Sequence, residues 1–345
     1  MKKNIILFSA IFFLSAGCGI FGSSGILGTM KTTDGGSSWQ QSNATEKSTV
    51  NISNLLVSEM GFEPGNHEVI YLASVNNGFW KSSDSAGKWK QILSKITAYD
   101  YFLDPTNTQN IFVTGTYNNH GRIVRSRDGG LTWEEVYSEA SANNSVNSIT
   151  ANPANPRELF AALNSGVLIK SMDGGDTWLV VYDFKDQILK VRYNNKSIYV
   201  LSRTKGLSKS IDNGVKWNTL TDSLTGLGGI FSYTSRTVEQ FYKLALDDQS
   251  SGVIFLTTNA GLYKTTDDGK NWQLQKLPVK NSAPRAIAST RGGMLAYTSI
   301  GNIVFKTLDG GKSWQTQPLT TTNVINKIII DPLLAQVAYA GLIEQ

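Results

Sequence analysis

Seven copies of one short phrase predict an all-β fold, a seven-bladed β-propeller. Each copy has a Lys or Arg, a Ser or Thr, any residue, an Asp, and a Trp five places after the Asp. Seven of the eight tryptophans stand in that slot, at steps of 39 to 55 residues, which is close to the length of a four-stranded propeller blade. Thirty-two glycines indicate the many turns that such a fold needs. The copies are Lys31–Trp39, Lys81–Trp89, Arg125–Trp133, Lys170–Trp178, Lys209–Trp217, Lys264–Trp272 and Lys306–Trp314.

The first residues are typical of an export leader. A basic Lys2-Lys3 pair precedes an apolar stretch, Asn4–Leu14, that is too short to span a bilayer as a helix. Leu14-Ser15-Ala16-Gly17-Cys18 then resembles a bacterial lipobox, in which the Cys is lipidated and becomes the new N-terminus. We therefore expect a signal peptide over 1–17, a lipid-anchor linker over 18–25 with Cys18 modified, and a propeller over 26–345. An ordinary secretory signal is the alternative.

Composition limits the function classes. The formal charge is +5 and falls to +3 without Lys2 and Lys3, which is too weak and too dispersed for a nucleic-acid partner. Cys18 is the only cysteine, so we expect no internal disulfide. We expect an extracytoplasmic monomer attached to the cell envelope by its lipid, without a cofactor.

The segment before the fourth Trp shows how one blade is built. Val146–Ala151, Leu159–Leu163, Gly166–Asp173 and Thr177–Tyr182 are predicted strands separated by turn residues. The innermost strands of the other blades are expected near Leu55–Val57, Tyr99–Leu103, Leu189–Tyr193, Phe241–Leu246, Arg285–Ala288 and Lys327–Ile330.

The Asp of each phrase is predicted to hold the turn between the third and fourth strands, because its carboxylate can accept from backbone N–H groups there. A Gly two places later permits a positive φ, and Ala86 in that slot predicts an irregular second turn. The Trp is expected to bury its ring between sheets. The structural residues are Asp34, Asp84, Asp128, Asp173, Asp212, Asp267, Asp309, Trp39, Trp89, Trp133, Trp178, Trp217, Trp272 and Trp314.

The two ends of the chain are expected to share the first blade. Only one strand, Ile26–Thr33, precedes the first Asp turn, whereas Asn326–Ile330 and Val337–Gly341 remain after the last outer strand. We expect the C-terminal strands to be inner and the N-terminal strands outer, which closes the ring and removes exposed sheet edges.

The phrases resemble the Asp-box, or bacterial neuraminidase repeat, S/T-x-D-x-G-x-x-W. That family of propellers includes sialidases, xyloglucanase-type hydrolases, sortilin-type receptors and a photosystem II assembly factor. The resemblance implies the fold and leaves the activity open. The chain lacks the Phe/Tyr-Arg-Ile-Pro sequence of sialidases, which are also six-bladed. Xyloglucanase-type enzymes use a cleft between two propellers, and this chain has the length of one.

The phrases admit two other interpretations. The sequence Thr266-Asp267-Asp268-Gly269 faintly resembles a calcium loop, but it offers too few oxygen ligands, so no metal site is expected. The basic residue three places before each Asp could attract anionic lipid; we favour a side chain that lies over the sheet with its charge in water.

Candidate binding residues lie on the face formed by the fourth-to-first and second-to-third strand connections. One connection there includes Tyr117, Asn119 and His120, and the longest is Asp222–Glu239, with Phe231, Tyr233 and Arg236. Polar residues on innermost strands are expected at the channel mouth, namely Asp100, Lys190, Arg285 and Lys327. No catalytic residue is identified. We expect a membrane-anchored binding or assembly scaffold that recognises a protein or glycan through one propeller face; a carbohydrate-active hydrolase is the alternative.

Overall fold

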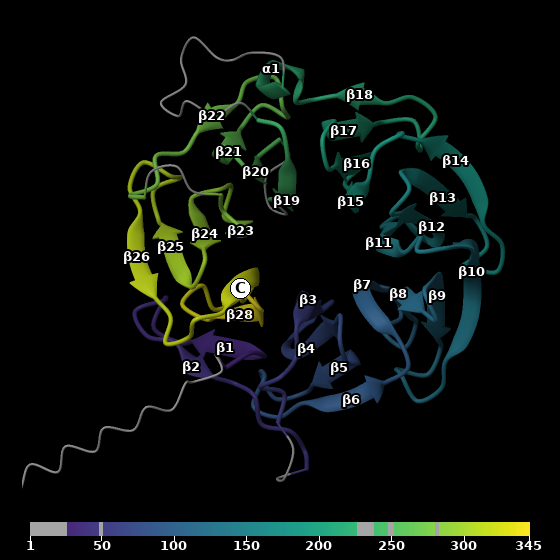
Figure 1. The fold of residues 1–345 in the computed structure, drawn as a ribbon, viewed down its shortest axis with the longest axis horizontal. Coiled ribbons are helices and arrows are strands. Elements are labelled where there is room, and N and C mark those ends of the chain that lie inside the picture. The colour runs from purple at the N-terminus through teal and green to yellow at the C-terminus, as the bar shows by residue number, and fades with distance from the viewer. Residues whose placement is uncertain (1–25, 48–50, 226–237, 248–251, 280–282) are drawn as a thin grey trace, which may run out of the picture.

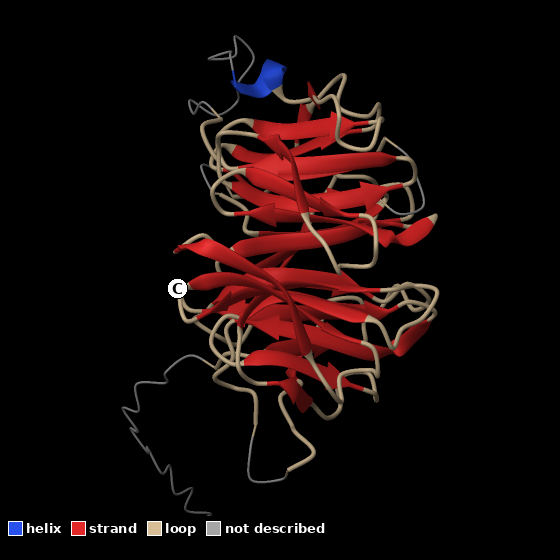
Figure 2. Cartoon of the chain, turned by 90° about the vertical axis from the view of Figure 1, so that its right-hand side faces the viewer, coloured by secondary structure: helices blue, strands red, loops and turns tan. Residues whose placement is uncertain are grey.

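The chain is a seven-bladed β-propeller. The computed structural model describes residues 26–47, 51–225, 238–247, 252–279 and 283–345. Seven four-stranded antiparallel sheets surround a central channel (Figure 1), and Figure 2 shows their strands crossing the thickness of the disc. Within the described ranges the helix is α1 (Asp222–Thr225), and no helix there is long and apolar enough to span a bilayer.

Each blade has four strands, named from the innermost outward. Blade one is β27 (Val324–Ile330), β28 (Ala338–Ile343), β1 (Thr29–Thr32) and β2 (Gln40–Gln41); blade two is β3 (Val57–Glu63), β4 (Asn66–Ser74), β5 (Gly78–Ser82) and β6 (Lys90–Leu93); blade three is β7 (Thr97–Leu103), β8 (Ile111–Tyr117), β9 (His120–Ser126) and β10 (Glu134–Ala142). Blade four is β11 (Val146–Asn152), β12 (Asn155–Leu163), β13 (Val167–Ser171) and β14 (Leu179–Asp183); blade five is β15 (Ile188–Asn194), β16 (Ser197–Ser202), β17 (Gly206–Ser210) and β18 (Asn218–Thr219). Blade six is β19 (Phe241–Leu246), β20 (Ile254–Thr258), β21 (Gly261–Thr265) and β22 (Gln273–Leu274); blade seven is β23 (Ala286–Thr290), β24 (Leu295–Ile300), β25 (Ile303–Thr307) and β26 (Gln315–Pro318).

The shared first blade is confirmed. The N-terminal strand β1 pairs antiparallel with the C-terminal strand β28, with Met30 opposite Ala340. The C-terminal strands are the inner pair, as expected, and the seven sheets close into a ring. Figure 1 shows the purple and yellow ends of the chain side by side in this sheet.

One innermost strand is misplaced in the sequence prediction. The strand expected near Leu55–Val57 begins only at Val57 and continues to Glu63. The preceding residues form a turn instead, because Leu55 N donates to Ile52 O and Leu56 N donates to the side chain of Asn76, at 3.0 Å each. Leu55 and Val57 are fully buried and Leu56 is half-buried, but the backbone of Leu55 and Leu56 forms its hydrogen bonds outside the sheet.

The recurrent phrase forms the turn between the third and fourth strands of every blade, and we call it the Asp–Trp turn. In blade seven, Asp309 Oδ1 accepts from Thr307 Oγ1 at 2.7 Å and from Ser313 N at 2.9 Å. Hydrogen bonds to hydroxyl and backbone donors hold the pKa of the equivalent Asp34 at about 2. These contacts place the Asp carboxylate at the centre of the turn.

The second Asp–Trp turn keeps the common geometry, so the predicted irregularity is wrong. Ala86 adopts a φ of 64°, and its N–H donates to Ser82 Oγ at 3.0 Å, as the Gly of the other turns does. Residues with a Cβ rarely adopt this conformation, so the hydrogen bonds around Asp84 outweigh a local steric cost.

The tryptophans of the Asp–Trp turns pack in clusters that include side chains of the neighbouring blade. Trp89 is fully buried, and its indole N–H donates at 2.8 Å to Ser42 O in the preceding blade. Trp133 and Trp272 donate to Ile92 O and Leu220 O in the same way. These three indoles therefore link their blades to the previous ones, whereas Trp178 and Trp217 donate to Gly175 O and Gly214 O within their own turns.

The basic residue of each phrase does not keep its charge in bulk water, which corrects the sequence interpretation. Lys306 Nζ lies 5.6 Å from the ring centroid of Tyr297 and donates at 2.6 Å to Gly35 O in the Asp–Trp turn of the next blade. Lys31 and Lys264 reach the next turn in the same manner. Lys81 and Lys170 instead pair with Glu63 and Glu158 of their own blades. All seven basic side chains are buried or half-buried, so they do not form an exposed basic ring.

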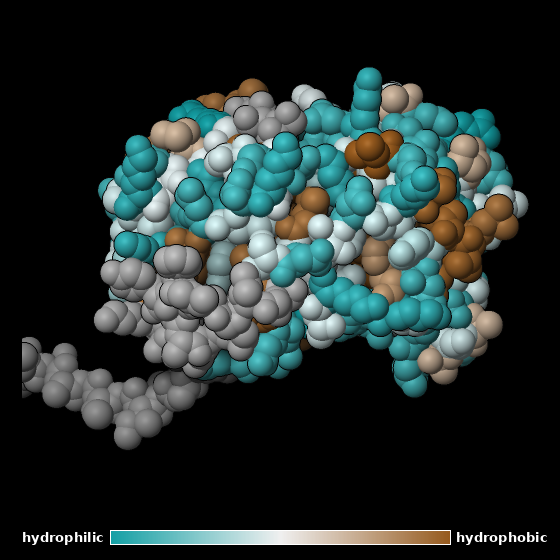
Figure 3. Space-filling view, turned by 90° about the horizontal axis from the view of Figure 1, so that it is seen from above, coloured by the Kyte–Doolittle hydropathy of each residue, from teal (hydrophilic) through white to brown (hydrophobic). Residues whose placement is uncertain are grey.

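The outer rim is largely polar but includes one apolar strip. Leu179 and Val180, on the edge strand β14, are 71% and 68% exposed. Figure 3 shows apolar side chains gathered at the right-hand edge of this side of the ring, where β14 lies in Figure 1. The strip is distant from the channel, because β14 is the outermost strand of blade four.

Candidate functional site

A β-bulge near the start of the innermost strand recurs in six of the seven blades. In β15, for example, the pairing with β16 skips from Ile188 to Lys190 and leaves Leu189 unpaired. A bulge places two residues opposite one and redirects their side chains. The bulged pairs are Ser58-Glu59, Tyr99-Asp100, Asn147-Ser148, Leu189-Lys190, Tyr242-Lys243 and Asn326-Lys327.

These bulges build one end of the central channel. All six unpaired residues line the cavity there, and four of the residues that follow them line it as well, namely Glu59, Lys190, Lys243 and Lys327. The cavity lies on the face of the fourth-to-first strand connections, because the bulges are near the beginnings of first strands. It has two overlapping lobes of about 440 and 470 Å³, which is within the range of small-molecule sites. We call this cavity the channel mouth.

A network of ion pairs crosses the channel below the mouth. Lys190 Nζ lies 3.0 Å from Asp100 Oδ1 and also contacts Glu59, so one ammonium joins two carboxylates from different blades. Arg192 Nη1 is 3.1 Å from Asp100 Oδ2. Lys327 contacts the other oxygen of Glu59. Asp100 is fully buried and also accepts from Ser148 Oγ at 2.6 Å.

The cations keep both carboxylates ionised. Burial favours a neutral Glu59, but the charges of Lys190, Lys327 and Arg192 outweigh it and hold the pKa of Glu59 well below its usual value. Burial likewise opposes ionisation of Asp100, and Arg192 and Lys190 lower its pKa. Neither carboxyl group retains a proton near neutral pH, so neither has the raised pKa of a general acid.

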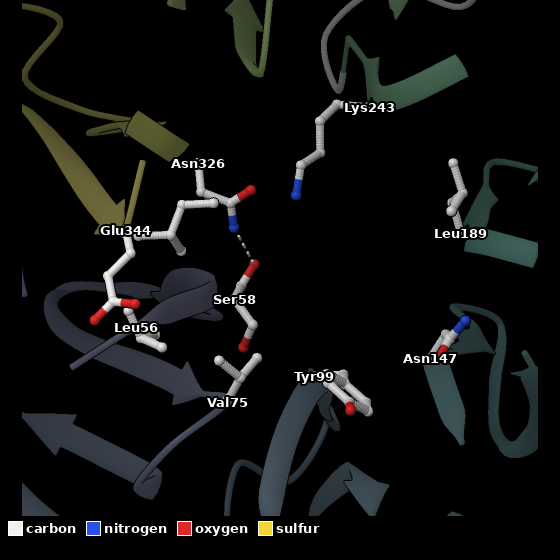
Figure 4. A pocket seen from close by; sticks show the side chains of 10 residues that line it. Leu56, Ser58, Val75, Tyr99, Asn147, Leu189, Lys243, Asn326 and Glu344 are labelled. Carbon is white, nitrogen blue, oxygen red and sulfur yellow. Dashed lines mark hydrogen bonds between the residues drawn. The ribbon is translucent and has the colours of Figure 1, made fainter. Parts of the chain in front are cut away.

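Three further cations at the mouth, Arg203, Lys243 and Arg285, have no carboxylate partner among the described residues. Arg203 Nε donates to Gln187 Oε1 at 3.1 Å. Among the described residues, neither Lys243 nor Arg285 forms an ion pair within 4.0 Å. Figure 4 shows the Lys243 side chain extending from β19 into the opening. Burial, with the charges of Lys190 and Lys327, lowers the pKa of Lys243 to about 8. Arg285 stacks on Tyr242, with its guanidinium carbon 4.2 Å from the ring centroid.

The structure brings together one group of the residues that the sequence singled out. Lys190, Arg285 and Lys327 line the mouth, and Asp100 lies directly below them. All four residues lie on or beside the innermost strands that surround the channel. Whether they bind a ligand stays a prediction.

The second group lies elsewhere. Tyr117 ends β8, and Asn119, with a φ of 63°, is in the two-residue turn that leads to β9. His120 Nδ1 is 2.9 Å from Glu139 O of β10, which places the imidazole against the outer strand of its own blade. These residues are not among those that line the mouth.

Only the two ends of the long connection belong to the described part of the chain. Asp222 begins α1, and Val238 and Glu239 lead into β19. Phe231, Tyr233 and Arg236 lie outside the described residues, as does Cys18. Their roles in binding and lipidation stay predictions.

Sequence reasoning misses two members of the channel network, Glu59 and Arg192, and one cation of the mouth, Lys243. Glu59 precedes a Met-Gly-Phe sequence and lies beyond the predicted strand limit at Val57, so the sequence does not place it on an innermost strand. Arg192 follows Lys190 by two residues and therefore shares its side of the strand. Lys243 stands in the same blade position as Lys190 and Lys327, but the bulge that makes them equivalent has no simple sequence signal.

The described residues contain no group of three or more His, Cys, Asp or Glu side chains arranged to hold a metal ion. Asp268, one of the two acidic residues of the calcium-like sequence, has partners of another kind. Asp268 contacts Lys209 of the neighbouring blade and accepts from Tyr199 Oη at 2.8 Å, so its oxygens serve an inter-blade contact.

The comparisons with known proteins agree on the fold and differ in function. No family model matches the chain. A xyloglucanase from Paenibacillus sp is 25% identical over 275 residues, covering 70% of this chain and 23% of the xyloglucanase. This chain thus spans about a quarter of that relative's length.

Solved structures give the same picture. The GH74 xyloglucanase from Xanthomonas campestris superposes with a TM-score of 0.66 at 17% identity, covering 84% of this chain and 51% of that one. YCF48 bound to D1 peptide has a TM-score of 0.63 at 14% identity, covering 83% of this chain and 93% of that one. At these identities the likeness establishes the propeller and no shared activity.

Proposed function

We propose that this protein is a membrane-anchored extracytoplasmic scaffold that holds a protein or glycan partner on the channel-mouth face. The observation that carries the proposal is that both carboxylates at the channel, Glu59 and Asp100, are ionised. Glu59 and Asp100 are both engaged by cations that lower their pKa values, which suits a rigid binding surface better than acid–base catalysis. Lys243 and Arg285, which have no carboxylate partner among the described residues, lie above them and are available to a ligand.

The place where the chain joins the ring supports an orientation for this scaffold. Ile26 O accepts from Thr321 Oγ1 at 3.0 Å and from Asn323 Nδ2 at 3.1 Å. Both donors lie in the connection from β26 to β27, on the channel-mouth side of the disc. If Cys18 bears the lipid, the seven residues 19–25 reach at most about 25 Å. The mouth would then lie near the membrane and could serve a membrane-associated partner.

The anchor has a direct test. Cys18→Ala should move the protein from the membrane fraction to the soluble fraction, because acyl chains contribute roughly 0.8 kcal/mol for each buried methylene and nothing else in the proposal holds the protein there. The measurement is fractionation of cells that express the wild type and the variant. Retention of the variant on membranes after a high-salt wash would contradict lipid anchoring.

A carbohydrate-active hydrolase is the second candidate, favoured by the xyloglucanase match over 70% of the chain. Hydrolysis with inversion or retention needs one protonated and one ionised carboxyl group flanking the bond. Glu59 and Asp100 do not form such a pair, because the pKa values of both carboxyl groups are lowered and both are ionised. We therefore expect no turnover of xyloglucan by the purified protein.

The experiment that separates the candidates combines binding and turnover. Purified protein is incubated with xyloglucan and a panel of sialosides and β-glucans, and released reducing sugar is measured. In parallel, the tagged wild type and Lys243→Met are used for pull-down from membranes and for a glycan array. Binding that weakens in Lys243→Met without turnover is the expected result. Turnover that is lost in Glu59→Gln or Asp100→Asn, with the fold retained, would overturn the scaffold in favour of the hydrolase.

A further inference from the structure

The channel mouth has an excess of positive charge that the described residues do not neutralise. Its lining includes five cationic side chains and two carboxylate side chains, Glu59 and Glu344, together with Gln345, the last residue of the sequence. Glu59 is already engaged by the deeper network. The cations are Lys190, Arg203, Lys243, Arg285 and Lys327.

Arg285 and Lys243 are arranged to receive an anion. Arg285 lies over the ring of Tyr242, and its guanidinium N–H groups suit a planar acceptor. Lys243, on the same bulge as Tyr242, extends into the opening. A carboxylate is the planar monoanion that such a pair of cations recognises.

The rest of the mouth is suited to a pyranose ring. Tyr99, Leu189 and Ile343 offer apolar surface for its C–H groups. The amide of Asn326 is oriented by donating to Val57 O at 2.8 Å, which leaves its oxygen as an acceptor for hydroxyl donors. Figure 4 shows Tyr99, Leu189 and Asn326 around the same opening as Lys243.

We propose that the channel mouth binds a uronic acid residue of an acidic glycan, with the carboxylate between Lys243 and Arg285 and the sugar ring against Tyr99 and Leu189. This inference rests on the proposed binding function and names its ligand class. An acidic peptide could supply the same carboxylate, but it has no need of hydroxyl acceptors beside the cations. The mixture of cations, aromatic surface and an amide acceptor favours the sugar.

The test uses the whole exported chain and trigalacturonate as the probe. Isothermal titration calorimetry should show binding of trigalacturonate that is at least about tenfold tighter than binding of its methyl ester, because a charge-assisted hydrogen bond contributes about 1.5–3 kcal/mol and 1.4 kcal/mol is a factor of ten. Lys243→Met should lose about tenfold in affinity, and Lys243→Arg should retain most of it. Lys216→Met, which removes an exposed charge from the opposite face, is the matched control.

Proton uptake on ligand binding tests whether Lys243 contacts the ligand, because a lysine that only stabilised the fold would take up no proton when the ligand binds. A bound carboxylate favours charged Lys243, so at pH 8 binding should take up protons, seen as a dependence of the heat on buffer ionisation enthalpy. Lys243→Met should abolish the dependence. The charged groups that face Lys243 from other strands are Glu59, Asp100, Lys190 and Lys327, and the mouth adds Arg203, Arg285 and Glu344.

The outcomes separate this inference from the scaffold itself. Equal affinity for trigalacturonate and its ester, or tighter binding of hexaglutamate than of trigalacturonate, would overturn the uronate site. A protein partner captured through the mouth, with no binding of trigalacturonate, would do the same and leave the scaffold standing. Thermal unfolding of Lys243→Met at the wild-type temperature establishes that the variant is folded.

Discussion

A chain that lacks 327–345 should lose cooperative thermal unfolding. The deletion removes most of β27 and all of β28, the two inner strands of blade one. It leaves β1 without the partner that it meets over Thr29–Thr32. Blades two and seven would then face an open gap in the ring, with free sheet edges on both sides.

The size of the expected effect follows from the apolar surface that is lost. Ile328, Tyr339 and Leu342 are each no more than 1% exposed and belong to the clusters that join blade one to its neighbours. Burying one large apolar side chain contributes roughly 1.5–3 kcal/mol. The loss of several such side chains therefore removes an amount of free energy comparable to the net stability of a typical domain, about 5–15 kcal/mol.

The measurement is differential scanning calorimetry, with a permuted chain as control. The permutant begins at Thr320, joins Gln345 to Ile26 through a short Gly-Ser linker and ends at Leu319. It keeps every strand of the ring while it moves the chain ends, so it should unfold cooperatively. A truncated chain that melts as one transition near the wild-type temperature would show that the shared blade is not needed for closure.

Glu59→Gln should destabilise the protein by about 3 kcal/mol, because removing one partner of a buried ion pair leaves the other charges uncompensated. Glu59 is the contact of both Lys190 and Lys327, and Arg192 lies 3.6 Å from it. With the substitution, Asp100 is the remaining carboxylate among the described members of the network. Removing one partner of a buried ion pair usually costs about 3–5 kcal/mol. We expect the lower value because the side chains of Lys190, Arg192 and Lys327 are partly exposed to water in the channel.

The same network predicts how stability depends on pH. The folded pKa of Glu59 is below the ordinary value of 4.5, so its contribution is complete above about pH 4.5 and is lost as the pH falls toward the folded value. Asp100 adds a loss of the same sign. The difference in stability between the wild type and Glu59→Gln should therefore be largest near neutral pH and should narrow in acid.

Urea unfolding of both proteins at pH 7 and pH 3 checks these statements. Glu135→Gln is the control, since the Glu135 side chain is 49% exposed and, unlike Glu59, can exchange its pair with Arg122 for water. If the Glu59→Gln protein were as stable as the wild type at pH 7, water in the channel would be solvating Lys190, Lys327 and Arg192, and their ion pairs with Glu59 would contribute no net stability.

Local sequence chemistry predicts much of this fold because the repeated elements interact over short distances. The Asp–Trp turn is closed by residues within a few positions of Asp309, so each copy specifies its own geometry. The pattern tolerates Ala86 for the same reason, since the hydrogen bonds around Asp84 do not require a Gly. The count of turns and the unequal chain ends together predict seven blades and their closure.

The network at the channel mouth could not be derived in this way. Glu59 and Lys190 are 131 residues apart in sequence, and they meet only because the ring brings blades two and five to one axis. The bulge that turns Lys243 toward the channel is a property of the pairing between β19 and β20. The sequence also does not show whether the basic residue of a phrase is exposed to solvent or bound to another blade. Lys306, for example, donates to Gly35 O, which belongs to the next blade.

The sequence by itself determined the turns, the number of blades and the way the ring closes, because each depends on neighbouring residues or on a count of repeats. The tertiary structure decided which charges meet in the channel. It also decided which of the described cations neutralise Glu59 and Asp100 and which stay without a carboxylate at the mouth. Those outcomes depend on long-range proximity and on the burial that alters each pKa, and neither quantity exists until the ring is closed.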